Sequence, residues 1–473
     1  PMRLSQARRT LRSSADRPAG RIRSGDAARI DAFIVSGFSP QAVEFEPLDV
    51  VAKRMRVLAE QSGGLDITEW EEKGDRIRFA GLTRKGRVPL KGIIGLDGGK
   101  LLGFQIEPDR RVRGPDAPVW PAAVDTLDAA VAAIEAEIDW RARDGRFSGA
   151  VLVARRGEVI LDQAWGLARR GPDLPNTPDT LFHTASTTKM LTAAAIGQLI
   201  DRGELSLDTS VADAVPGLAS APGARDATIR DLLGHRVSYG DFLGLPTYQA
   251  LEREDLRATD LLPLIADRAP KAAPPDRISY SNANYLVLAA AIEAATGDSY
   301  YDYVRDHILQ PTGMADTDFG TPEVRPTRAA IGWIKDYDAH PLGDGEWQAN
   351  DGRLPYHGGP AGGTWMSARD MGRFLQALTQ GRLVEPATLA AMMKDSRTGA
   401  RTFRHGLGFM LNEANGRGYF GHDGGGGNAG VSTAAFTSLD GEWSVVVLSN
   451  YSSGGDDLGK TIIDFFLTAL PPE

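Results

Sequence analysis

Ser186 and Lys189 stand three residues apart at the point where a strongly apolar segment begins. The apolar residues after Ser186 recur at helical spacing; they are Met190, Leu191, Ala194, Ile196, Leu199 and Ile200. This pattern predicts a helix that begins near Ser186. Because residues i and i+3 share one face of a helix, Lys189 should lie one turn from Ser186.

A serine at the start of a helix has two interpretations. Its hydroxyl becomes a nucleophile only beside an activating base or cation, and a buried lysine can serve because burial lowers its pKa. The helix start adds a positive field and free backbone N–H groups. However, Ser-x-x-Lys is a short pattern, and a serine at an exposed helix start is commonly a plain cap. The choice between a nucleophile and a helix cap depends on whether other motifs of the chain could activate Ser186 or bind its substrate.

Tyr280-Ser281-Asn282 is the first candidate partner, and it precedes a second apolar helical pattern from Leu286 to Ile292. A tyrosine in such a loop could act as a general base if neighbouring cations lower its pKa from about 10. Asn282 could offer its amide to a substrate carbonyl. The alternative is a turn in which Ser281 and Asn282 cap the next helix.

A glycine-rich segment from Gly421 to Gly430 is the second candidate partner, and strand-like runs follow it at 431–436 and 443–450. We interpret it as a strand edge that leads into an antiparallel hairpin. Glycines let a substrate approach the backbone, whose N–H groups can hold an oxyanion. The segment also contains a GxGxxG match that ends at Gly430, but a strand follows instead of a helix, which argues against dinucleotide binding.

In this order and at this spacing, the three motifs resemble those of the serine β-lactamase and penicillin-binding-protein superfamily. The resemblance is strongest to the branch of class C β-lactamase-like esterases and peptidases, and it spans residues 125–470. Further similar segments lie at 147–154, 157–166, 202–208, 229–235, 311–314, 360–370 and 445–450. The resemblance implies an α+β fold, in which an antiparallel sheet with flanking helices carries an inserted helical subdomain.

The resemblance also implies a role for each motif. Ser186 would be the acylated nucleophile, and Lys189 and Tyr280 would share the proton transfers. The substrate-binding and oxyanion residues would be Asn282, His422, Asp423, Gly424 and Gly425. The backbone N–H groups of Ser186 and Gly425 would form the oxyanion hole, and the chemistry would need neither a cofactor nor a metal. An ordinary strand histidine is the alternative for His422.

Several departures from the family pattern bear on the substrate. His422 stands where many relatives carry lysine, so this position offers less positive charge to a substrate carboxylate at pH 7. Asp423 replaces a small residue or threonine, and its carboxylate could repel a substrate carboxylate or pair with an amine. Arg236 and Tyr239, which follow His235 in place of Thr-Ser-Gly, should make the rim of the site bulkier and charged.

Composition narrows the function classes. A chain of 473 residues with 42% apolar content is expected to form two domains. The net charge of −9 argues against general nucleic-acid binding. The chain has no cysteine, which excludes disulfides and thiolate chemistry. No apolar run is long enough to predict a transmembrane helix, and the lack of a GxSxG motif argues against the α/β-hydrolase fold.

The sequence predicts four segments. Residues 1–26 are rich in arginine and should form a disordered basic tail, or one that docks on an acidic surface. Two helical and four strand patterns at 27–110 predict a small α+β module that is similar to cystatin- or NTF2-like modules and is a candidate surface for self-association. A proline-containing linker at 111–123 leads to the hydrolase domain at 124–473.

The leading interpretation is a serine hydrolase that forms an acyl-enzyme on small-molecule esters or amides, as a carboxylesterase does. One alternative is a peptidase, D-aminopeptidase-like or DD-peptidase-like, that acts on small peptides. Another is a β-lactamase, which His422 disfavours. The third is a catalytically silent scaffold or sensor, which an intact Ser186, Lys189 and Tyr280 disfavour. The N-terminal segment lacks the apolar core of a signal peptide. The compartment stays open between a bacterial-type cytoplasm and, if a leader has been removed, the periplasm.

Overall fold

The computed structural model describes residues 37–38 and 48–470, apart from 74–75, 87, 98–99, 110–112, 114–115, 244, 250–255, 321–327, 336–344, 351–356, 399–402 and 427–428. Two compact units make up the chain: Pro1–Ala117 with Lys335–Gln348, and Pro118–Ile334 with Ala349–Glu473. The predicted basic tail and the predicted helix at 26–34 lie outside the described residues. None of the described helices is long and apolar enough to cross a membrane.

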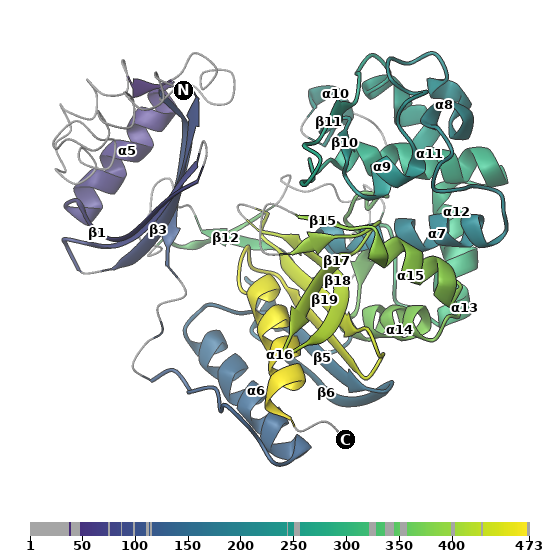
Figure 1. Ribbon diagram of the computed structural model, residues 1–473. Coiled ribbons are helices and arrows are strands. Elements are labelled where there is room, and N and C mark those ends of the chain that lie inside the picture. Colours follow the sequence, from purple (N-terminus) through teal and green to yellow (C-terminus); the bar gives the residue numbers. More distant parts are fainter. Residues whose placement is uncertain are drawn as a thin grey trace. The chain divides into compact units, whose positions relative to one another are not determined.

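A helix followed by four strands forms the core of the first unit. The elements are α5 (Leu48–Ser62), β1 (Leu65–Lys73), β2 (Arg76–Thr83), β3 (Pro89–Asp97) and β4 (Lys100–Pro108), and the strands pair antiparallel in chain order. Met55 and Leu58 of the helix share one apolar cluster with Ile77, Leu90 and Leu101 of the sheet. Figure 1 shows the helix lying along one face of these strands, so this unit has an α+β architecture.

An eight-stranded sheet forms the frame of the second unit, with the strand order β15-β16-β17-β18-β19-β20-β5-β6. Its strands are β5 (Gly149–Arg155), β6 (Glu158–Trp165), β15 (Arg397–Thr398), β16 (Arg404–His405), β17 (Met410–Ala414), β18 (Arg417–Gly425), β19 (Ser432–Ser438) and β20 (Trp443–Ser449). All neighbouring strands pair antiparallel. The last strand of this sheet in the chain, β20, pairs with the first, β5, as Val447 with Val151, so strands from the two ends of this unit lie side by side, with β6 alone beyond them at the edge.

Alternate residues of the central strands enter two different cores. Val151 and Val447 face the cluster that includes α6 (Leu127–Arg143) and α16 (Gly455–Ala469). Leu152 and Leu448 face the cluster that includes α7 (Lys189–Asp201), α11 (Asn282–Thr296) and α14 (Ala368–Thr379). Successive side chains of a strand point to opposite faces. Helices cover both faces (Figure 1), which is why β5 and β20 are buried along almost their whole length and consist mainly of apolar residues.

The remaining elements are short. They are β7 (Leu167–Arg169), β8 (Leu174–Pro175), β9 (Phe182–His183), the 3₁₀ helix η2 (Ala185–Thr188), α8 (Val211–Ala214), η3 (Pro216–Leu218), α9 (Ile229–Leu233), β10 (Val237–Ser238), α10 (Pro246–Gln249), η4 (Ala258–Leu264), β11 (Lys271–Ala272), α12 (Tyr300–Val304), the π-helical turn η5 (Arg305–Leu309), α13 (Gln310–Thr312), β12 (Trp333–Lys335), β13 (Trp347–Ala349), β14 (Trp365–Met366) and α15 (Pro386–Lys394). Most of the helices among them, with α7 and α11, form the predicted helical subdomain. Both α7 and α11 are buried on nearly all sides, which places the helix after Ser186 in the interior.

The packing of α16 on the sheet makes a stability prediction. Phe466 is fully buried, and its ring stacks on that of Trp443 with a centroid separation of 4.3 Å. Phe466→Ala should lower the free energy of unfolding by about 3–5 kcal/mol, because it leaves a cavity against the sheet. Urea unfolding followed by tryptophan fluorescence would measure this loss. Val159→Ala is the matched control, since Val159 is exposed and should change stability by no more than about 0.5 kcal/mol. Equal effects of the two variants would contradict the prediction.

Candidate active site

Ser186 lies on η2, the 3₁₀ turn that leads into α7. The preceding residue, Ala185, has a φ of 47°, a left-handed conformation that costs a non-glycine residue about 1–3 kcal/mol. Its backbone is held from two sides. The N–H of Ala185 donates to Nδ1 of His183 at 3.3 Å, and its carbonyl accepts from the N–H of Gly363 at 3.1 Å. These contacts fix the backbone from which the Ser186 hydroxyl projects.

Lys189 is the first residue of α7, and none of its surface is exposed to solvent. Its Nζ lies 3.3 Å from Oγ of Ser186 and 2.8 Å from Oδ1 of Asn282, and it also contacts the backbone carbonyl of Ala361. Burial lowers the pKa of Lys189 to about 7, and the negative charge of Asp241 acts in the opposite direction. A substantial fraction of Lys189 is therefore a neutral amine at neutral pH.

The neutral form of Lys189 fits these three contacts. A neutral amine has two N–H donors and one lone pair. The carbonyl oxygens of Asn282 and Ala361 can only accept hydrogen bonds, so they take the two donors. The lone pair is then left for the hydroxyl of Ser186, which can donate. Lys189 is thus oriented to accept the proton of Ser186.

Asp241 decides which end of the Asn282 side chain faces Lys189. Its Oδ2 accepts a hydrogen bond from Nδ2 of Asn282 at 2.7 Å, and a carboxylate can only accept. The amide nitrogen must therefore point to Asp241 and the amide oxygen to Lys189. A line of hydrogen bonds runs from Asp241 through Asn282 and Lys189 to Ser186.

Tyr280 stands over Lys189, with the Nζ atom 4.9 Å from the centre of its ring. Although 42% of the residue is exposed, protein surrounds the hydroxyl, and this burial raises the pKa of Tyr280 well above 10. A hydrogen bond with Ser186 acts against this rise, whereas the charges of Asp423 and Asp241 add to it. The condition under which Tyr280 could act as a general base, a pKa lowered by neighbouring cations, is therefore not met. Tyr280 is a protonated phenol at neutral pH, and in the free enzyme it can donate a proton but not accept one.

Three buried histidines surround Tyr280. The ring of His235 lies 4.4 Å from that of Tyr280, His405 lies at 6.4 Å and His422 at 6.5 Å, measured between ring centres. Burial lowers the pKa of His405 to about 4 and that of His422 to about 3, and it also lowers the pKa of His235 well below its usual value. All three rings are thus neutral at pH 7. His422 contacts the backbone carbonyl of Asp423 through Nδ1, so that atom carries its proton.

The glycine-rich edge of β18 comes close to the nucleophile through Gly424. A Cβ atom at this position would lie only 2.7 Å from the backbone nitrogen of Ser186, so a side chain there would displace one of the two segments. Gly425, the next residue, has a φ of 83°, which favours glycine. Asp423 is partly exposed, and its charge reaches Tyr280. Gly427, which belongs to the GxGxxG match, lies outside the described residues.

Some features of the site were not predicted from the sequence. The partners of Lys189 include the Ala361 carbonyl, and Asn282 is held by Asp241. Asp241 follows the predicted rim segment but shows no motif of its own. The expectation of a bulkier, charged rim is wrong: Tyr239 is buried, with 1% of its surface exposed, and Arg236 is paired with Asp395. Among the described residues, no group of His, Asp or Glu side chains is arranged to hold a metal ion.

Because Asp241 raises the pKa of Lys189, its replacement should change the pH dependence of kcat/KM. If neutral Lys189 is the base, kcat/KM should rise with pH with an apparent pKa near 7. Asp241→Asn removes the charge that raises the pKa of Lys189, so the rising limb should move to lower pH. Because Asp241 is exposed, this displacement should shrink as salt is added. A pH–rate profile with a chromogenic ester at low and high salt would measure both effects.

Asp267→Asn is the matched control for this experiment. Asp267 is also exposed and lies in the same subdomain, but it does not contribute to the pKa shift of Lys189. Its removal should leave the pH profile unchanged. The effect of Asp241 on the pKa of Lys189 would be contradicted if the rising limb of the pH profile did not move in Asp241→Asn. It would also be contradicted if the limb moved equally in both variants.

Comparisons with known proteins agree with this geometry. The family model described as Beta-lactamase matches residues 126–465. Esterase EstB of Burkholderia gladioli is 35% identical over 316 residues, which cover 60% of this chain and 80% of the esterase. Penicillin-binding protein 4 of Amycolatopsis lactamdurans is 30% identical over 326 residues, which cover 62% of this chain and 83% of that protein. The crystal structure of a D-stereospecific amidohydrolase from a Streptomyces species has a TM-score of 0.57 at 25% identity, and covers 72% of this chain and 98% of that one. The matched region contains the sheet, the helical subdomain and the Ser186–Lys189 pair, and the chain belongs to the Beta-lactamase family.

Proposed function

We propose that this protein hydrolyses ester or amide bonds of small molecules through an acyl-enzyme at Ser186, with a carboxylesterase-like preference. The observation that carries the proposal is the buried Lys189. Its pKa near 7 makes the neutral amine available, and in that form its N–H groups can donate to Asn282 and Ala361 while its lone pair accepts the proton of Ser186. Burying a lysine is costly unless it is neutralised or well partnered, and a merely structural role would not require contact with a serine hydroxyl.

The proposed acylation step uses the site's groups in turn. Lys189 takes the proton of Ser186 as Oγ attacks the substrate carbonyl. The backbone N–H groups of Ser186 and Gly425 hold the oxyanion that forms. Tyr280, a phenol under the site's electrostatics, donates a proton to the leaving alcohol or amine and recovers one from Lys189. In deacylation water attacks the ester in the same manner, and the carboxylic acid leaves with Ser186 restored.

The charged and neutral side chains around the site influence which substrates it favours. Neutral His422 offers no cation to a substrate carboxylate, and the charges of Asp423 and Asp241 both reach Tyr280. Substrates that are neutral or carry an amine should therefore be favoured over those with a free carboxylate. The relative named as an esterase supports ester substrates. The relative named as a D-stereospecific amidohydrolase supports the second candidate, hydrolysis of amides that carry an amine.

Labelling of Ser186 tests the proposed nucleophile. A fluorophosphonate should add one label to the protein, and peptide mass spectrometry should place it on Ser186. Ser186→Ala should abolish labelling and lower the turnover of p-nitrophenyl esters by at least about 10³-fold. Ser206→Ala is the matched control, because Ser206 is an exposed serine. Label on another residue would overturn the assignment, and no label together with no turnover would favour the silent scaffold.

Selectivity should depend on His422 and Asp423. The wild type should hydrolyse nitrocefin poorly and neutral esters or amine-bearing amides better. The double variant His422→Lys, Asp423→Thr restores the charge pattern of many relatives. It should shift the ratio of kcat/KM toward nitrocefin by about 1–3 kcal/mol for one changed charge contact. Parallel kinetics on esters, D- and L-amino-acid amides and nitrocefin would show this shift. Efficient nitrocefin hydrolysis by the wild type, or an unchanged ratio in the variant, would exclude these residues as the basis of selectivity.

A further inference from the structure

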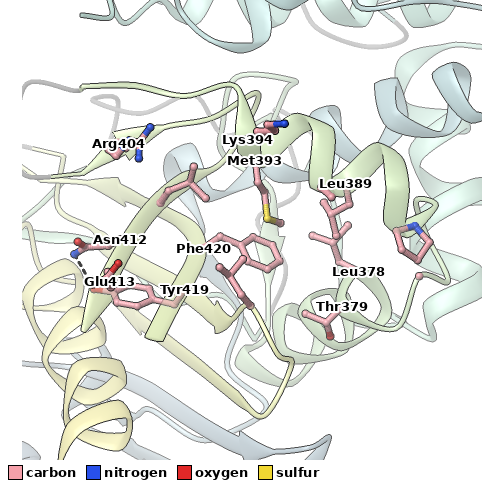
Figure 2. Close-up of a pocket in the computed structure, with 16 residues that line it drawn as sticks. Leu378, Thr379, Leu389, Met393, Lys394, Arg404, Asn412, Glu413, Tyr419 and Phe420 are labelled. Carbon is pink, nitrogen blue, oxygen red and sulfur yellow. Dashed lines mark hydrogen bonds between the residues drawn. The ribbon is translucent and has the colours of Figure 1, made fainter. Parts of the chain in front are cut away.

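A pocket separate from the catalytic groups lies between α15 and the strands β16, β17 and β18 (Figure 2). Its volume is about 610 Å³, which is in the usual range for a site that holds a small organic molecule. Its apolar wall includes Leu378, Leu389, Met393, Leu411 and Phe420. None of the predicted catalytic or substrate-binding residues lines it.

Two cations lie along one edge of this pocket. Figure 2 shows Lys394 and Arg404 on that edge, whereas Leu378 and Thr379 lie on the opposite one. Both cations are exposed at the mouth, so they border the apolar wall without being buried by it. The pocket is thus polarised, with a positive edge and an apolar interior.

The described residues offer no acidic partner to the two cations of this edge. Lys394 and Arg404 have no ion pair or side-chain hydrogen bond within the described part of the chain. The carboxylate next in sequence, Asp395, is engaged by Arg230 and Arg236. Both cations are therefore free to contact an anionic group of a ligand at this edge.

Asn412, Glu413 and Tyr419 are further polar residues of the pocket lining, and they lie together on one side of it. Asn412 donates to the hydroxyl of Tyr419 at 2.9 Å. Glu413 is the acidic residue of the lining, and in Figure 2 it lies beside these two residues, below Arg404 and apart from Lys394. An anionic group that enters along the upper edge would therefore meet the two cations before Glu413.

We propose that this pocket binds a long-chain fatty acid, with its carboxylate at Lys394 and Arg404 and its alkyl chain along Leu389, Met393 and Phe420. The apolar wall selects for alkyl surface, since burial of methylene groups drives binding. The unpaired cations select for an anionic headgroup through charge-assisted hydrogen bonds. A short carboxylate would leave the apolar wall uncovered, and a neutral alkyl compound would leave the cations without a partner.

Isothermal titration of the full chain with dodecanoate, below its micelle concentration, tests the proposal. We expect saturable binding of one molecule per chain. Each buried methylene should strengthen binding by about fourfold, so hexanoate should bind at least about 100-fold more weakly. Dodecan-1-ol should bind at least about tenfold more weakly, because it lacks the charge. Ser186→Ala should bind dodecanoate as the wild type does, which separates this site from the proposed catalytic one.

Two variants locate the binding. Lys394→Glu combined with Arg404→Glu should weaken dodecanoate binding at least about tenfold. The control with the same charge change is Lys53→Glu with Arg225→Glu, since both residues are exposed; it should bind normally. Ala390→Trp should abolish binding, because Ala390 lines the pocket and a large side chain would fill it. Ala391→Trp is its control, since Ala391 is exposed on the same helix but is not a lining residue.

Three results would overturn the proposal. The first is no saturable binding of dodecanoate. The second is binding that survives both pocket variants or is lost on acylation of Ser186, which would move the ligand to the catalytic site. The third is equal binding of dodecanoate and dodecan-1-ol, which would show that the cations do not recognise the headgroup. None of these results bears on whether Ser186 is the nucleophile.

Discussion

The burial of Lys189 is the constraint on which the catalytic half of the structure depends. A lysine with no exposed surface must lose its proton or gain several partners. The fold does both, since burial lowers its pKa to about 7 and three oxygens surround its Nζ. The unfolded chain, whose lysine has a pKa of 10.5, binds more protons than the folded one between pH 7 and 10.5. This group's contribution to stability therefore rises with pH across that window, and near neutral pH the buried Lys189 is held against a stability cost.

The residues around Lys189 come from two parts of the fold that meet at Ser186. The helical subdomain supplies Asn282, Asp241 and Tyr280, while the sheet supplies Gly424 and His422. Two residues with left-handed backbone lie beside these groups: Ala185 precedes Ser186, and His235, with a φ of 51°, packs on the ring of Tyr280. Strained residues persist only where the surrounding structure holds them, so the site is fixed in place before a substrate arrives.

The sequence predicted those parts of the site that depend on local spacing. The positions of Ser186 and Lys189 on one helix face follow from the i and i+3 rule, and the apolar runs of the central strands indicated a sheet. The direction of the Tyr280 pKa could not be predicted, because it depends on burial and on two carboxylates distant in the chain. Asp241 was missed for a similar reason: it lies 41 residues from Asn282, in a loop without a periodic pattern. The charged rim was wrongly predicted because spacing alone does not tell whether Tyr239 points inward.

The register in which β18 pairs with β19 determines which residues of β18 face the candidate active site. Successive side chains alternate between faces, so Phe420, His422 and Gly424 share the face toward the helical subdomain, and Asp423 points the other way. On that shared face, Phe420 lines the pocket beside α15, and the neutral ring of His422 lies near Tyr280. Gly424, which has no side chain, lies beside Ser186. A slip of one residue toward the C-terminus would place the side chain of Asp423 where Gly424 now leaves room for the backbone of Ser186, and Gly421 where the ring of His422 now lies. The pairing of His422 with Ala435 and of Gly424 with Thr433 prevents this slip, so the hydrogen bonds of the sheet determine which groups of the strand reach the nucleophile.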